Sequence, residues 1–182
     1  MAVRKRVFIP NRIYFITFTI LNWQKVFVSR KYCDLVYKGF DYQKYQYGNK
    51  VHGYVIMPNH LHLLVYVTKA SPPLSKLIQN SKRFLAYGII KELERDKAVA
   101  TLMLFREHAL ANKGAKHKVF EDGFDSKLVE SETFCRQKLD YIHHNPCREP
   151  WNLAVKPEEY IYSSATNYYL GSGLYPVDRL TF

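Results

Sequence analysis

VHGYVIMPNHLHLLVYV, residues 51–67, is the stretch of sequence that decides the fold. It contains two runs rich in apolar and β-branched residues, 51–56 and 61–67, joined by Met57-Pro58-Asn59. β-Branched residues favour strands, whereas proline and asparagine favour turns. The stretch therefore predicts a β-hairpin.

The segments on the N-terminal side of the hairpin predict a strand and a helix. Residues 13–20 alternate between apolar and other residues with the period of two that is typical of a strand. Ser29 is placed to cap a helix over about 31–47, which Gly48-Asn49 would end.

The segments after the hairpin predict two more helices and a strand. Ser71-Pro72-Pro73 opens a helix over about 74–97 with a continuous apolar stripe. Residues 106–118 lose this periodicity and are expected to form a mobile basic loop, and residues 119–129 are expected to contain a short strand. Ser131 would cap a third helix, which must end near Asn145 because Pro146 disfavours helical geometry in the residue before it.

The order of these elements, β-α-β-β-α-β-α, indicates an α+β protein. It fits a ferredoxin-like antiparallel sheet with helices packed on one face. No internal repeat and no linker divides the sequence, so we expect one domain over 1–182. Its core would span about 8–146, and residues 147–182 would wrap the surface with at most one short element.

Composition points to a nucleic-acid partner. The chain has 27 Lys and Arg against 16 Asp and Glu, a net charge of +11 that usually indicates a polyanionic ligand. Fifteen tyrosines and eleven phenylalanines could stack on unpaired bases. The three cysteines form no CxxC pair, which argues against a disulfide framework or a thiolate zinc site. With neither a signal peptide nor a stretch able to span a bilayer, the protein is expected to be cytoplasmic, with no membrane partner.

His60-Leu61-His62 is the strongest candidate for a chemical site. Residues i and i+2 of a strand point to the same face, about 7 Å apart, and two imidazoles at that separation can share a metal ion. A single buried histidine would more often be a satisfied core residue, but two on one face each need a partner that offsets desolvation. Other chemistries fit less well: a histidine triad would need a third histidine where Leu64 stands, and no HExxH, Walker A or GxSxG pattern occurs.

Three motifs together resemble a known family. The segment 57–65 (MPNHLHLLV) resembles the HUH motif, histidine–hydrophobic–histidine, of the single-tyrosine transposases. Residues 141–146 (YIHHNP), followed by Arg148, are similar to the tyrosine helix of the REP-associated tyrosine transposase branch, and 160–165 (YIYSSA) resembles its Tyr-x-Trp-Ser-Ser segment. The resemblance covers roughly residues 8–170.

The resemblance implies a metal-dependent transposase that nicks and rejoins single-stranded DNA bearing hairpins, through a 5′-phosphotyrosine. It implies that His60 and His62 bind a divalent metal, Mg²⁺ or Mn²⁺, that Tyr141 is the nucleophile, and that Asn145 is the third ligand. Tyr141 and Asn145 are one helical turn apart, so one helix can present both. His144 is the alternative ligand, because Asn145 lies at the end of the helix.

The sequence also suggests DNA contacts and allows two other functions. Lys82, Arg83 and Arg148 are the candidate DNA-binding residues. The family's Val-Arg-Ala-Gly is replaced here by residues 147–150 (CREP) and its tryptophan by Tyr162; both changes lie outside the proposed metal ligands and nucleophile and concern hairpin recognition. The alternatives are a non-cleaving nucleic-acid-binding protein of the same fold and a metal-dependent phosphodiesterase that uses water. A homodimer that exchanges its tyrosine helix is also compatible with the sequence.

Overall fold

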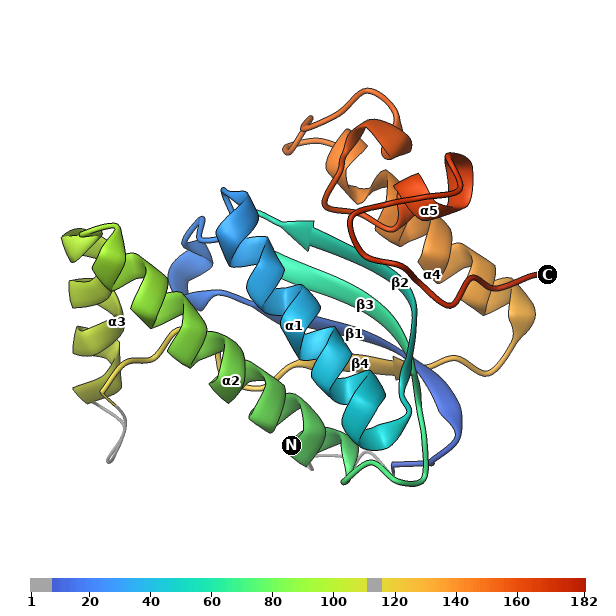
Figure 1. The fold of residues 1–182 in the computed structure, drawn as a ribbon, viewed down its shortest axis with the longest axis horizontal. Coiled ribbons are helices and arrows are strands. Elements are labelled where there is room, and N and C mark those ends of the chain that lie inside the picture. The colour runs from blue at the N-terminus through green and yellow to red at the C-terminus, as the bar shows by residue number, and fades with distance from the viewer. Residues whose placement is uncertain (1–7, 111–115) are drawn as a thin grey trace, which may run out of the picture.

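The computed structural model describes residues 8–110 and 116–182. Its centre is a four-stranded sheet in the order β2-β3-β1-β4, in which every neighbouring pair is antiparallel (Figure 1). The strands are β1 (Arg12–Thr19), β2 (Lys50–Met57), β3 (His60–Val67) and β4 (Asp125–Leu128). The helices are α1 (Arg30–Tyr47), α2 (Leu74–Arg95), α3 (Val99–Leu110), α4 (Glu132–His144) and α5 (Ala165–Tyr169). Short 3-10 turns are η1 (Leu21–Trp23), η2 (Asn145–Cys147) and η3 (Pro157–Glu159). The predicted α+β, ferredoxin-like sheet is confirmed.

The two faces of the sheet are covered by different helices. On one face, side chains such as Ile16, Leu61 and Leu63 pack with α1 and α2, which is the expected arrangement. Helix α4 lies on the opposite face (Figure 1), where a smaller core joins Phe15 and Leu64 to it. Because side chains alternate along a strand, the even-numbered positions of β3 face α4.

The helix ends follow the sequence signals. Gly48 ends α1 with φ of 68°, a left-handed conformation that glycine adopts at little cost. The Oγ of Ser131 accepts a hydrogen bond of 3.2 Å from the backbone N of Phe134 and so caps α4. The α-helical geometry ends at His144, and a 3-10 turn that contains Pro146 follows.

The expected loop over 106–118 is wrong for its first part, since α3 extends through Leu110; residues 111–115 lie outside the described part of the chain. The helix forms because Phe105 and Ala109 are buried in tertiary contacts near α2, although its apolar residues do not form a stripe. Contacts with the rest of the fold therefore outweigh the weak local pattern.

The C-terminal segment contains more structure than expected. Both η3 and α5 lie in it, where at most one short element was predicted. Ser163 forms an antiparallel bridge with Val55, and the backbone N of Ser164 donates to the carbonyl of Tyr54 at 2.9 Å. The segment thus covers the open edge of β2, where unpaired backbone groups would otherwise remain. Among the described residues, none of the helices is both apolar and long enough to cross a membrane.

Candidate metal and nucleophile site

His60 and His62 lie side by side on the face of β3 that packs against α4. Their ring centroids are 4.8 Å apart, and each residue is buried, at 6% exposure. The expected placement of both imidazoles on one face is confirmed.

Neighbouring polar groups orient both rings. The Nδ1 of His60 donates to Oδ1 of Asn59 at 2.7 Å, because an amide oxygen can only accept. The Nε2 of His60 is then the unprotonated nitrogen. The Nδ1 of His62 shares a hydrogen bond of 2.8 Å with Oγ1 of Thr17, its partner in the β1–β3 register. In metal sites, hydrogen-bond partners on the second ring nitrogen hold each histidine in one orientation.

Burial also fixes the charge state of the pair. Desolvation lowers the pKa of His60 to about 4, although the Asn145 side chain raises it in part. Desolvation lowers the pKa of His62 to about 3, and repulsion from His60 and Lys138 lowers it further. Both rings are therefore neutral at pH 7, the state in which imidazole can bind a metal.

Tyr141 extends from α4 toward His62. Its Oη lies 3.5 Å from Nε2 of His62, and the two rings meet edge to face with centroids 5.1 Å apart. Phe15 packs against both rings, at 5.5 Å from His62 and 5.9 Å from Tyr141. The half-buried Tyr141 thus holds its hydroxyl beside the histidine pair.

Asn145 completes the cluster, because its side chain interacts with that of His60, and His144 does not enter it. Asn145 is 8% exposed, and its Oδ1 is buried without a hydrogen-bond partner. Such an atom normally has a partner, because leaving it unpaired costs about 1–3 kcal/mol. His144 points elsewhere: its Nδ1 lies 3.1 Å from the backbone carbonyl of Asp140 and 3.0 Å from the Asp140 carboxylate.

The donor set of the cluster is two neutral imidazole nitrogens and one amide oxygen. The described part of the chain contains no group of three or more His, Cys, Asp and Glu that could hold a metal. The third donor is instead the unpaired amide oxygen of Asn145, a residue of none of those four types. These residues fit a divalent cation that accepts nitrogen and oxygen ligands.

Two cations lie beside the Tyr141 ring: Arg148, which was predicted to bind DNA, and Lys138, which was not predicted. The guanidinium of Arg148 is 5.8 Å from the ring centroid. The Nζ of Lys138 is 5.6 Å from the same ring and 5.0 Å from that of Phe15. Its position three residues before Tyr141 on one helix was the available signal, since i and i+3 share a face.

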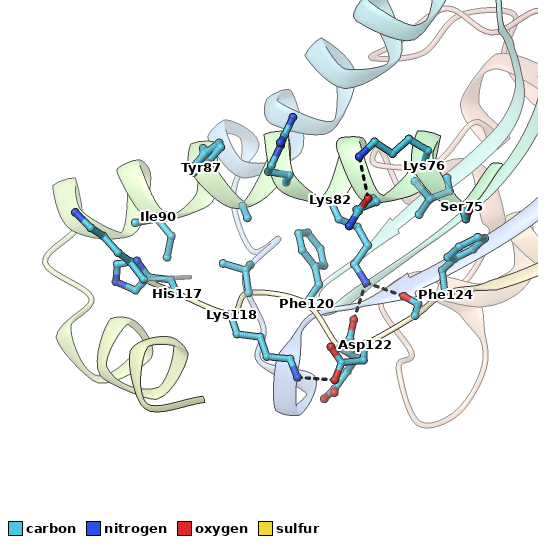
Figure 2. A pocket seen from close by; sticks show the side chains of 18 of the residues that line it. Ser75, Lys76, Lys82, Tyr87, Ile90, His117, Lys118, Phe120, Asp122 and Phe124 are labelled. Carbon is cyan, nitrogen blue, oxygen red and sulfur yellow. Dashed lines mark hydrogen bonds and ion pairs between the residues drawn. The ribbon is translucent and has the colours of Figure 1, made fainter. Parts of the chain in front are cut away.

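Lys82 and Arg83 lie on α2, which covers the other face of the sheet. They line a groove of about 1440 Å³ between α2 and residues 116–124 (Figure 2). The Nζ of Lys82 donates to the carbonyls of Glu121 at 2.6 Å and Gly123 at 2.7 Å. The structure therefore does not bring Lys82 and Arg83 to the histidine cluster, and their contact with DNA stays a prediction.

Comparison with solved structures shows the same fold in a transposase. A REP-associated tyrosine transposase, solved bound to a REP hairpin, superposes with a TM-score of 0.67 over all of this chain and 93% of that one, at 17% identity. A protein from Deinococcus radiodurans R1, provisionally described as a transposase, gives a TM-score of 0.48 at 17% identity, over 78% of this chain and 95% of that one. No protein-family model and no curated protein matches the chain. The chain thus has the fold of a REP-associated tyrosine transposase.

Proposed function

We propose that this protein nicks and rejoins single-stranded DNA, with Tyr141 as the nucleophile and His60, His62 and Asn145 as the ligands of Mg²⁺ or Mn²⁺. The observation that carries the proposal is the 3.5 Å approach of the Tyr141 hydroxyl to His62, in a buried cluster that also holds the unpaired Oδ1 of Asn145. Helix α4 supplies the nucleophile, and the 3-10 turn that directly follows it supplies the third ligand.

When bound at these three residues, a divalent metal would polarise the scissile phosphate and neutralise the charge that develops on it. The chain prepares the cluster for this. Asn59 and Thr17 orient the two rings, and burial keeps both rings neutral.

The proposed reaction is a transesterification. The Oη of Tyr141 forms a bond to phosphorus while the bond from phosphorus to the 3′ oxygen breaks. The phenol loses its proton and the departing 3′ oxygen gains one, so no proton is consumed overall. The 5′-phosphotyrosine keeps a phosphodiester linkage, and a 3′-hydroxyl of a second strand can therefore reverse the step without ATP.

Single-stranded DNA carrying a hairpin is the proposed substrate. The net charge of +11 favours a polyanion, and the similar transposase was solved with a hairpin. Arg148 lies where it could bind a phosphate next to Tyr141. Of the two residues on α2, Arg83 is the better candidate for a DNA contact, because two carbonyls already hold the ammonium of Lys82.

We also propose that residues 1–182 act as one domain, with a core over about 8–146. Within this domain the C-terminal segment forms backbone hydrogen bonds with β2, and the hydroxyl of its Ser164 forms a hydrogen bond with the buried His143 of α4. A dimer that exchanges α4 stays a prediction from the family resemblance.

A denaturing gel tests the proposal. The protein is incubated with Mn²⁺ and 3′-end-labelled single-stranded hairpin DNA from the repeats beside its own gene. We expect the label to shift to the mass of the protein, and Tyr141→Phe and His60→Ala to abolish the shift. Tyr87→Phe, which removes a hydroxyl from an exposed tyrosine of α2, is the matched control and should keep it.

The rival functions give different results in the same experiment. Cleavage without a shift that persists in Tyr141→Phe would indicate a phosphodiesterase that uses water. Binding without cleavage of any hairpin tried would indicate a nucleic-acid-binding protein that has the fold but not the chemistry.

A further inference from the structure

Trp23 is an exposed tryptophan at the edge of the proposed site. It lies in η1, just after β1, and its side chain is 61% exposed. Its ring centroid is 6.1 Å from that of His60, with the planes 68° apart. Tryptophan is highly buried on average, and an exposed indole beside a chemical site therefore suggests a ligand.

The backbone that presents Trp23 is strained. Asn22 has φ of 50° and Trp23 has φ of 55°, in the left-handed region that bulky residues rarely adopt. A left-handed bulky residue persists only where surrounding structure holds it, and such positions gather at functional sites.

Specific hydrogen bonds hold this conformation. The backbone N of Trp23 donates to the carbonyl of Ile20 at 3.0 Å, and the carbonyl of Trp23 accepts from Nδ2 of Asn59 at 3.1 Å. The same Asn59 side chain orients His60 through its Oδ1. One amide thus fixes both the histidine and the segment that carries the indole.

We propose that Trp23 binds an unpaired DNA base next to the scissile phosphate by stacking on the exposed indole. This inference rests on the proposed function, which places that phosphate at His60. The base attached to a phosphate there is within reach of an indole centred 6.1 Å from the His60 ring. Aromatic side chains beside basic surface bind single strands in this way, because every base has a face that can stack.

The net charge of +11 favours a nucleic-acid strand over an acidic or neutral protein segment as the occupant. Arg148 adds a cation at the proposed site itself, because it lies beside Tyr141, whose hydroxyl approaches His62. The exposed indole is therefore set in a region suited to a polyanionic ligand.

Fluorescence tests the inference directly, because the chain has only two tryptophans. The second, Trp151, is half-buried, and its ring centroid lies 5.6 Å from that of His60. In a Trp151→Phe, Tyr141→Phe protein, which cannot form the adduct, all tryptophan emission comes from Trp23. We expect oligo-dT to quench this emission saturably, and an oligomer of the same length with abasic sugars to leave it unchanged.

A second test separates stacking from a structural role. Trp23→Asn removes the indole but places a residue that tolerates left-handed φ. We expect this variant to melt no lower than the parent, while its affinity for oligo-dT falls roughly 5- to 150-fold, the effect of losing one stacked base. Trp23→Phe should keep most of the affinity. Tyr45→Ala, which removes a 91% exposed aromatic from α1, should change neither property.

The outcomes are distinguishable from those of the cleavage assay. Quenching and weaker binding of Trp23→Asn support the inference even if no covalent adduct forms. Unchanged Trp23 emission while labelled oligo-dT is fully bound would overturn it. Unchanged affinity of Trp23→Asn would do the same, as would equal quenching by the abasic oligomer.

Discussion

Substitution of Gly53 by alanine should loosen the contact between the sheet and α4. A Cβ added at Gly53 would lie 2.7 Å from Cδ1 of Leu139, closer than carbon atoms approach, and 3.6 Å from Oγ of Ser164. Leu139, a residue of α4, is 6% exposed in the core between this helix and the sheet, so it cannot move without disturbing its neighbours. Tyr141 lies two residues further along the same helix. The added methyl therefore strains the packing that positions the proposed nucleophile.

The expected cost follows from overpacking. Forcing one extra methyl group into a packed core typically destabilises a protein by about 1–3 kcal/mol. Gly39→Ala is the matched control, because a Cβ at Gly39 of α1 meets nothing within 4 Å. That substitution should stabilise the helix by about 0.5–1 kcal/mol, since glycine is a poor residue for a helix interior. The same chemical change should thus have opposite signs at the two positions.

Urea denaturation measures both variants, with the midpoint reporting stability if the slope is unchanged. A double substitution identifies the contact: Leu139→Ala alone should cost about 2–5 kcal/mol. Combined with Gly53→Ala it should cost less than the sum by about 1 kcal/mol or more, because the two residues are in contact. Additive costs, or a Gly53→Ala protein as stable as Gly39→Ala, would refute the reasoning.

Three further predictions concern the site. Burial lowers the pKa of His60, His62 and His143 to about 4, 3 and 4, whereas an unfolded histidine titrates near 6.5. At mildly acidic pH the unfolded chain therefore binds more protons than the folded one. The free energy of unfolding should fall from pH 6.5 toward pH 4, by up to roughly 1.4 kcal/mol per pH unit for each histidine. Thermal melts at a series of pH values measure this. Lys138→Gln should make the plot of log K against log salt concentration for oligo-dT binding shallower by about 0.7, because one phosphate contact is lost. Asn145→Leu should weaken Mn²⁺ binding in calorimetry without lowering the stability of the metal-free protein, because it removes an unpaired buried oxygen.

Each of these has a control or a contradicting result. His143→Gln should make the pH dependence shallower by about the share of one histidine. Lys44→Gln removes an exposed charge of α1 and should leave the salt slope of binding unchanged. An equal change of the slope in both lysine variants would mean that net charge alone explains the effect. Equal Mn²⁺ affinity of the parent and Asn145→Leu would exclude Asn145 as a ligand.

The hairpin and the site pair could be predicted because they depend on local rules. Alternation along a strand places His60 and His62 on one face whatever the rest of the fold does. A spacing of four residues places Tyr141 and Asn145 on one side of a helix. The position of Pro146 marked where that helix ends.

The features that were missed depend on distant contacts. Residues of α3 have no amphipathic stripe, so only its tertiary contacts reveal it. Trp23 and His60 are brought together by the β1–β3 register, in which Thr19 lies opposite His60. Lys82 has the sequence context of an exposed cation, yet backbone carbonyls 39 and 41 residues away hold it. No local pattern encodes such pairings.

Mapping the covalent adduct tests the central claim most directly. After reaction with Mn²⁺ and hairpin DNA, the protein is digested with nuclease and trypsin and analysed by mass spectrometry. Cleavage after Lys138 and Arg148 releases residues 139–148, a peptide whose only tyrosine is Tyr141. We predict a nucleotide mass on this peptide, at Tyr141, and none in the His60→Ala protein. A nucleotide on another tyrosine, or cleaved DNA with the peptide unmodified, would contradict the account.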